Sequence, residues 1–252
     1  MAGSVGSSSF ALAFVPGVTP GKWVRIWNER LPEVPLNLVD TSAADAAGLV
    51  RDGEVDAVLL RLPTDRTGLH AIPLYTETTV VVVAKDHVVT AADEVTPEDL
   101  ADEVVLHPLD DTLDWERPPG RPAIERPATT GDAIELVAAG VGLLVVPQSL
   151  ARLHHRKDLT YRPLTDVPQS RVALSWPEEE TTDLMEEFIG VVRGRTVNST
   201  RGRRQEPAPA KRSGGDGKKS PARKPASGKA RPGSGAPKGG KRGKPGKPRR
   251  RP

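Results

Sequence analysis

Short runs of apolar residues alternate with amphipathic or polar stretches through the first 195 residues of the chain. Apolar runs with turn residues at their ends predict buried strands, and apolar positions that recur every three or four residues predict helices. Because the two kinds of segment alternate, we expect an α/β fold with parallel strand pairing and helices covering the sheets. The expected strands cover residues 10–15, 36–39, 55–60, 79–84, 104–106, 143–146, 159–162 and 172–176.

Capping residues indicate where the helices begin. Thr19 can cap the first helix, Pro20 suits its first position, and Trp23, Trp27 and Leu31 then recur four residues apart. The last helix carries an apolar stripe that includes Met185 and Phe188, as an amphipathic helix on a core does. Similar signals predict helices that begin after Thr41 and Ser42, at Thr96, after Thr129 or Thr130, at Pro147 and at Thr182.

Charge divides the chain into an acidic body and a basic tail. The last 56 residues contain 19 of the 36 Lys and Arg residues but only two of the 33 acidic residues, Glu206 and Asp216. The tail therefore carries a net charge of +17 and the preceding 196 residues carry −14. From Val197 onward there is no Leu, Ile, Met, Phe, Tyr or Trp, so residues 196–252 are expected to be disordered.

A tail of this composition favours contact with a polyanion. Lysine and arginine bind phosphates without regard to sequence, and no aromatic residue is present to stack on a base. DNA or RNA is the expected partner; an acidic membrane surface, a purely solubilising role and folding back onto the acidic body are the alternatives. The residues expected to contact nucleic acid are Arg203, Arg204, Lys218, Lys219, Arg223, Lys224, Lys241, Arg242, Arg249, Arg250 and Arg251.

Several classes of protein are excluded by what the sequence lacks. Without cysteine there are no disulfides, thiolate catalysts or cysteine-based zinc sites. No apolar run is long enough to span a membrane, and the first nine residues, expected to be disordered, do not look like a secretory signal. We expect a cytoplasmic protein, with association with the nucleoid as an added option.

No catalytic or cofactor motif is recognisable. There is no G-x-S-x-G and no phosphate-binding loop, and the adjacent His154 and His155 diverge on a helix, so they do not share a metal. Asp110, Asp111 and Asp114 lack the glycine and the terminal glutamate of a calcium loop. We therefore expect neither an enzyme nor a bound cofactor or metal.

Five segments resemble one known family. They are the apolar run at residues 10–15 with its turn, residues 27–34, residues 49–57, residues 84–87, and residues 136–147, the last (Leu-Val-Ala-Ala-Gly-Val-Gly-Leu-Leu-Val-Val-Pro) being the most specific. Residues 10 to about 193 resemble the effector-binding (substrate-binding) domain of LysR-type transcriptional regulators. The resemblance implies a two-lobed fold of the type 2 periplasmic-binding-protein class.

The resemblance also implies a division of the chain. Residues 10–78 and 161–195 would form lobe one, and residues 79–160 would form lobe two. Members of that family begin with a winged helix-turn-helix, whereas only nine residues precede the first strand here. The expectation is a module without its own operator-reading head, and a homodimer is plausible by analogy.

An effector would lie between the lobes, beyond the carboxyl ends of the strands. The family's effector-contacting loops correspond here to Thr19, Thr41, Ser42, Arg61, His107, Thr129 and Thr130. Free N–H groups at three helix starts favour a small anionic metabolite. Each residue has an alternative role. The hydroxyls could be helix caps and nothing more, Arg61 could pair with Asp65 or Asp56, and His107 could be an ordinary loop histidine.

Two hypotheses follow. The first is a ligand-sensing module, related to transcription regulation, that binds an anionic metabolite between its lobes and contacts nucleic acid through its tail. The second is a nucleic-acid-associated interaction protein whose ligand cleft is vestigial. An enzymatic function is the weakest reading, because no catalytic pair is present and fold alone confers no chemistry.

Overall fold

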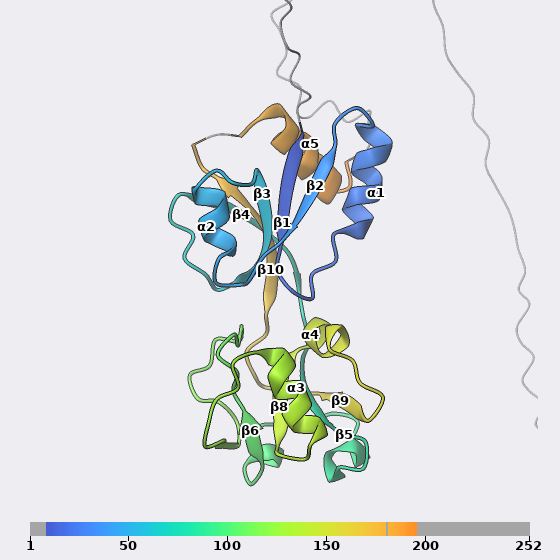
Figure 1. Ribbon diagram of the computed structural model, residues 1–252, viewed down its shortest axis with the longest axis vertical. Helices are drawn as coiled ribbons and strands as arrows, with labels where there is room; N and C mark the ends of the chain where they lie inside the picture. The colour runs from blue at the N-terminus through green and yellow to red at the C-terminus, as the bar shows by residue number, and fades with distance from the viewer. Residues whose placement is uncertain (1–8, 180, 196–252) are drawn as a thin grey trace, which may run out of the picture. The chain divides into compact units, whose positions relative to one another are not determined.

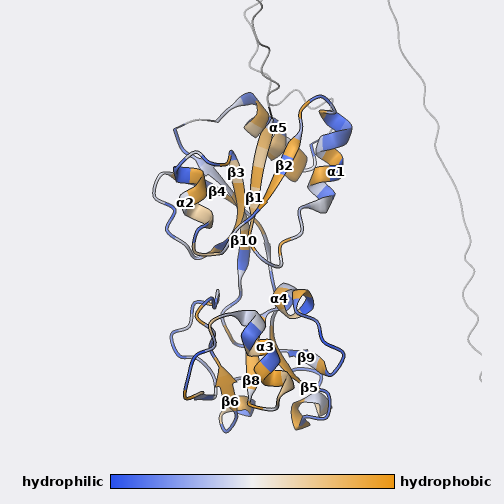
Figure 2. Ribbon diagram, in the orientation of Figure 1, coloured by the Kyte–Doolittle hydropathy of each residue, from blue (hydrophilic) through white to orange (hydrophobic). Residues whose placement is uncertain are grey.

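The computed structural model describes residues 9–179 and 181–195, which form two five-stranded sheets with helices packed against them (Figure 1). Each sheet and its helices make one lobe. Apolar residues concentrate in the strands and on the inward sides of the helices (Figure 2). The arrangement confirms the two-lobed α/β fold that the sequence predicts.

Lobe one contains the sheet of order β2-β1-β3-β10-β4. β1 pairs in parallel with β2 and β3, as expected for alternating strands and helices, whereas β10 is antiparallel to both β3 and β4. The strands are β1 (Phe10–Phe14), β2 (Leu36–Asp40), β3 (Ala57–Leu62), β4 (Leu69–Thr76) and β10 (Arg171–Pro177), and the helices are α1 (Gly21–Arg30), α2 (Ala46–Arg51) and α5 (Asp183–Val192).

An aromatic cluster joins the two ends of the described chain in lobe one. The rings of Phe10 on β1, Trp27 on α1 and Phe188 on α5 are fully buried, with centroids 5.0 to 5.7 Å apart. Trp27 Nε1 donates to the carbonyl of Val34 at 2.9 Å, so the indole buries no unpaired donor. Large buried aromatic rings are strong contributors to core stability, and here they fix α5 on the first strand.

Lobe two contains the sheet of order β7-β6-β8-β5-β9. Val80 and Val82 of β5 face the core under α3 and α4, while Val81 and Val83 face a second core on the opposite side. Burial on both faces explains why this strand is apolar at every position after Thr79. The elements are β5 (Thr79–Ala84), β6 (Val104–Leu106), β7 (Arg121–Pro122), β8 (Leu143–Pro147), β9 (Leu159–Pro163), α3 (Thr130–Ala138), α4 (Gln148–Leu153) and the 3₁₀ turns Val88–Ala91 and Glu98–Leu100.

Two chain segments cross between the lobes side by side. The first lies between β4 and β5, and the second lies between β9 and β10. The amide of Glu77 donates to the carbonyl of Ser170 at 2.8 Å, and the hydroxyl of Thr79 donates to the carbonyl of Pro168 at 2.6 Å. These bonds hold the two crossing segments together where they leave lobe one.

Some details of the sequence prediction need correction. The sequence does not predict β4, β7 or the turn at Val88–Ala91. The lobe boundary placed after residue 160 falls inside β9, which pairs with β5 from Leu159 to Pro163, so lobe two continues through this strand. The expected disorder of residues 1–8 and 196–252 lies outside the described residues.

Candidate functional site: the interlobe cavity

A cavity of about 770 Å³ lies where the two lobes meet. Lobe one contributes the loop after β1, the last residue of β2 and the first crossing segment, and lobe two contributes α4. We call this space the interlobe cavity. Its lining residues are Phe14, Pro16, Gly17, Val18, Thr19, Asp40, Tyr75, Thr76, Glu77, Thr78, Gln148, Ser149, Arg152 and Leu153.

Strand direction explains why these segments converge. β1 and β2 are parallel, so the loop after Phe14 and the end of β2 at Asp40 reach the same edge of the sheet. In lobe two, α4 begins directly after β8, whose last residue, Pro147, pairs with Thr79 at the start of β5. The carboxyl end of β8 therefore brings α4 to the crossing segment.

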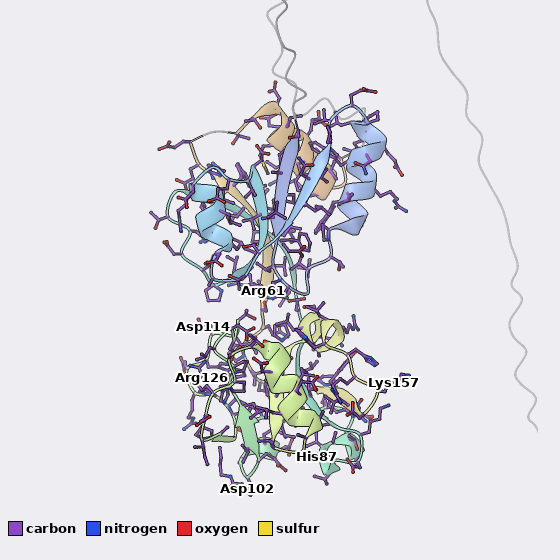
Figure 3. All side chains as sticks on the ribbon, viewed as in Figure 1. Arg61, His87, Asp102, Asp114, Arg126 and Lys157 are labelled. Atoms are coloured by element: carbon purple, nitrogen blue, oxygen red, sulfur yellow. The ribbon has the colours of Figure 1, made fainter. Side chains whose placement is uncertain are left out.

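Arg61 lies near the end of β3, on the side of lobe one that faces lobe two (Figure 3). Its side chain is only 3% exposed and pairs with Glu77, whose carboxylate accepts from Nε at 3.2 Å and from Nη2 at 3.0 Å. Nη1 donates to the carbonyl of Pro16 at 2.7 Å, and Nη2 donates to the hydroxyl of Ser149 at 2.9 Å. Because Ser149 belongs to α4, this guanidinium connects the two lobes directly.

Gly17 is required for this contact. Its φ of +83° is a conformation that residues with a side chain rarely adopt, and a Cβ there would lie 2.7 Å from Ser149 Oγ and 3.1 Å from Arg61 Nη2. Glycine thus lets the loop after β1 pass closely over the bridge between Arg61 and Ser149.

Neither of the two aspartates considered as alternative partners of Arg61 pairs with it. Asp65 instead pairs with Arg51 at 2.9 Å, and Asp56 accepts a hydrogen bond from the amide of Ala11 at 2.7 Å. Arg61 is neutralised by Glu77, a residue that the sequence analysis did not consider. Four of the donor contacts of its guanidinium are already made inside the protein, so the geometry assigns Arg61 to the junction of the lobes.

The remaining charges of the cavity are Asp40 and Arg152. Within the described part of the chain, neither side chain has an ion-pair partner within 4.0 Å; Arg152 Nε donates to the hydroxyl of Tyr161 at 3.3 Å. Tyr75 lines the same space, and burial together with the charge of Glu77 raises the pKa of its phenol. Its hydroxyl therefore stays protonated and can donate a hydrogen bond.

Of the predicted ligand residues, only Thr19 lines the interlobe cavity. Thr19 does not cap α1, because Pro20 occupies the cap position and no side chain bonds there. Ser42 instead closes a turn before α2, accepting from the amide of Asp45 at 3.1 Å and donating to its carboxylate at 2.6 Å. The hydroxyl of Thr41 lies 3.5 Å from the carbonyl of Ser42.

Thr129 and Thr130 have structural roles at the start of α3. Thr129 forms a capping box with Asp132: its hydroxyl accepts from the amide of Asp132, and its own amide donates to that carboxylate, both at 3.1 Å. The buried Thr130 donates to the carboxylate of Asp110 at 2.9 Å. These contacts account for both hydroxyls as parts of the helix start.

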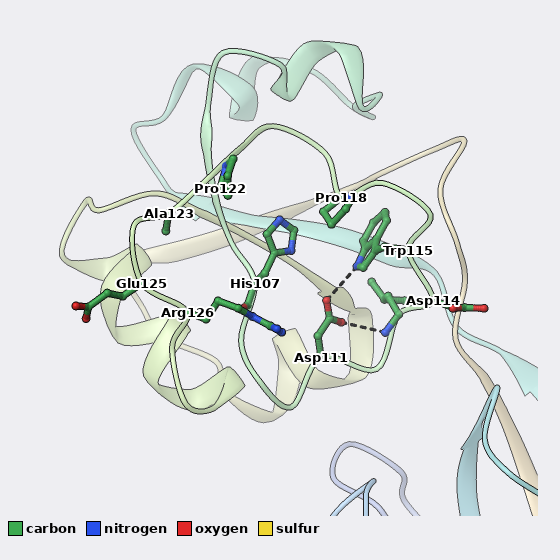
Figure 4. A pocket seen from close by; sticks show the side chains of 10 residues that line it. His107, Asp111, Asp114, Trp115, Pro118, Pro122, Ala123, Glu125 and Arg126 are labelled. Carbon is green, nitrogen blue, oxygen red and sulfur yellow. Dashed lines mark hydrogen bonds between the residues drawn. The ribbon is translucent and has the colours of Figure 1, made fainter.

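His107 lines a different cavity, of about 480 Å³, within lobe two (Figure 4). Burial lowers the pKa of its imidazole, and nearby Arg126 lowers it further, while Asp111 opposes the change. Asp111 accepts hydrogen bonds from Leu113 N at 2.9 Å and from Trp115 Nε1 at 3.0 Å. The predicted set is therefore divided between two cavities, two helix starts and, for Arg61, the junction of the lobes.

Sequence reasoning missed most of the cavity. Asp40 had a usable signal, since it directly follows the apolar run of β2. Tyr75 belongs to a strand that was not predicted, and Glu77 lies in the segment that follows it. Arg152 looks like an ordinary exposed helix residue. The nucleic-acid contacts expected between Arg203 and Arg251 lie outside the described residues.

Two further findings concern residues 9–179 and 181–195. No group of three His, Asp or Glu side chains in them is arranged to hold a metal ion. None of the helices there has the length and apolar character needed to cross a bilayer.

Two α/β lobes, joined by paired crossing segments and with a cavity between them, define the two-lobed class of fold that the sequence predicts. Residues 7–196 match the family model described as the LysR substrate binding domain. The chain therefore belongs to the LysR substrate-binding-domain family. Such domains are parts of transcriptional regulators rather than enzymes, in agreement with the expectation from the sequence.

Curated relatives extend beyond the region that this chain shares with them. The HTH-type transcriptional regulator AlsR of Bacillus subtilis (strain 168) is 26% identical over 200 residues, which cover 75% of this chain and 64% of that protein. A probable hydrogen peroxide-inducible genes activator of Mycobacterium leprae (strain TN) is 31% identical over 131 residues, covering 48% and 42%. The chain thus spans less than two thirds of either relative.

Solved structures agree on the fold. The BenM effector binding domain with its effector benzoate superposes with a TM-score of 0.64 at 19% identity, covering 74% of this chain and 91% of that one. The Corynebacterium glutamicum OxyR C206 mutant gives a TM-score of 0.61 at 24% identity, covering 76% and 66%.

Proposed function

We propose that this chain senses a small metabolite with a carboxylate group, which binds in the interlobe cavity and changes the angle between the lobes. The observation that carries the proposal is the composition of the cavity, whose walls come from both lobes. A ligand that contacts both walls binds more tightly when the lobes are closed, so it shifts the population toward that state.

Arg152 is the residue best suited to receive the carboxylate. It lines the cavity and has no acidic partner in the described residues, whereas Arg61 is already neutralised by Glu77. Tyr75, with its protonated hydroxyl, and Phe14 add a donor and an apolar wall on the opposite lobe. The solved BenM domain holds benzoate, a carboxylate, as its effector, which supports the same chemical class here.

Calorimetry of the full chain against a panel of small carboxylates and amino acids tests this proposal. We expect one compound to bind in a 1:1 ratio, and Arg152→Gln to weaken it by about ten-fold or more, the cost of losing a hydrogen bond to a charged group. Arg25→Gln removes an exposed arginine on α1 and serves as the matched control. If no compound binds, or if both variants weaken binding equally, the proposal is wrong.

The biological setting is also a proposal. We infer that the module acts in transcription regulation in the cytoplasm, that two copies associate, and that the basic tail contacts DNA or RNA without sequence preference. The +17 charge of residues 197–252 supports the last point. The same charge favours the second candidate function, a nucleic-acid-associated interaction protein, which needs no ligand in the cavity.

A further inference from the structure

The charges that line the interlobe cavity are of both signs. Three charged residues line it: Asp40, Glu77 and Arg152. Glu77 is buried and paired with Arg61, so its charge is already compensated. Among the described residues, Asp40 and Arg152 have no ion-pair partner, and each lies on a different lobe. A simple anion would neutralise the charge of Arg152 but would leave the charge of Asp40 without a partner in the same cavity.

We infer that the ligand is a small zwitterion, whose carboxylate binds Arg152 of lobe two and whose ammonium group binds Asp40 of lobe one. The inference rests on the proposed function and narrows its ligand class. The carboxylate of Asp40 repels a bound anion, whereas an ammonium group beside it gains a charge-assisted hydrogen bond. The two charged groups of one molecule would then pair with both side chains.

The position of the two residues links this chemistry to lobe closure. Asp40 is the last residue of β2, and Arg152 lies near the end of α4, so a zwitterion that reaches both connects the sheet of lobe one with a helix of lobe two. A compound with only one charge engages one lobe and has less differential affinity for the closed state. The sign pattern thus selects against both simple carboxylates and simple amines.

The apolar part of the ligand has a place in the same cavity. Tyr75 and Leu153 are large side chains that remain 41% and 54% exposed there, and Phe14 and Val18 add apolar surface. A hydrocarbon chain placed against these residues removes apolar area from water. We therefore expect a zwitterion with an aliphatic or aromatic portion rather than a small, fully polar one.

Four probes separate the two charges on one carbon frame. L-norleucine and 6-aminohexanoate are zwitterions with near and distant charges, hexanoate lacks the ammonium group of both, and pentylamine lacks the carboxylate of both. We expect at least one zwitterion to bind the full chain about ten-fold or more tightly than hexanoate and pentylamine, measured by calorimetry at pH 7.

Two variants assign the contacts. Asp40→Asn should bring the affinity for the zwitterion down to that for hexanoate, and Arg152→Gln should bring it down to that for pentylamine. Asp45→Asn, which changes an exposed carboxylate in the turn after Asp40, is the matched control and should leave binding unchanged. Equal effects of Asp40→Asn on zwitterion and hexanoate would overturn the assignment.

The other outcomes separate this inference from the proposed function. Hexanoate binding as tightly as the zwitterions overturns the inference and leaves carboxylate sensing intact. The same conclusion follows if none of the four binds while another simple carboxylate of the broader panel does. If no compound of either set binds, both fail. A double-mutant cycle that finds Asp40 and Arg152 coupled in the ligand-free protein also overturns the inference, because the residues would then pair with each other.

Discussion

At the scale of single residues, the junction between the lobes depends on one buried ion pair. Arg61 and Glu77 are both nearly inaccessible to water, and such a pair is costly to break because the remaining charge stays buried. The pair is also the origin of the contact with Ser149, so it influences lobe orientation as well as stability.

We predict that Arg61→Met lowers the free energy of unfolding by roughly 3–5 kcal/mol, since it leaves Glu77 buried without a partner. The measurement is urea denaturation followed by circular dichroism. Arg61→Met combined with Glu77→Leu should recover much of the loss, because no unpaired charge remains. Equal destabilisation in the single and double variants would show that the charge of Glu77 is not the cause.

Some residue roles could be read from the sequence and others could not. The start of α3 was placed after Thr129 or Thr130 because a threonine ahead of a helix is a local signal, and in the structure Thr129 is the cap. The partner of Arg61 was not predicted, because Glu77 is 16 residues away and follows β4, which β10 separates from the strand of Arg61 in the sheet. Pairing of this kind depends on tertiary structure, and one sequence carries no local signal for it.

At the scale of elements, strands with continuous apolar runs were the easiest to predict. β5 and β6 have the expected bounds because both strands contribute residues to the cores on the two faces of their sheet, which favours an unbroken apolar run. β4 was missed since only its first residue, Leu69, is buried and a proline interrupts it at residue 73. For the same reason Tyr75 and Thr76 were not predicted to line the interlobe cavity, since both belong to this strand.

The start of α3 provides a prediction at this scale. Thr129→Ala removes the hydroxyl that caps the helix and should cost about 1 kcal/mol, or roughly 2–4 °C in Tm for a domain of this size. Thr129→Ser keeps the hydroxyl and is the control, measured by the same thermal denaturation. A Tm unchanged by the alanine variant would mean that the capping box adds no net stability.

At the scale of the whole molecule, an acidic body and a strongly basic tail share one chain. If the tail binds nucleic acid through phosphates alone, a chain ending at residue 195 should lose its affinity for duplex DNA, while ligand binding in the cavity stays unchanged. Fluorescence anisotropy at several salt concentrations checks this. Binding that survives the truncation, or an affinity that does not fall steeply with salt, would assign the contact elsewhere.

The order of the strands in lobe one has a consequence for synthesis. β10 lies between β3 and β4, and α5 supplies Phe188 to the core beside Phe10, so this sheet needs residues from both ends of the described chain. All strands of lobe two, in contrast, are contained between Thr79 and Pro163. As the chain leaves the ribosome, lobe two is complete while lobe one still lacks β10, the antiparallel strand between β3 and β4. Lobe one, whose first strand is translated first, is therefore completed only after β10 and α5 have been translated.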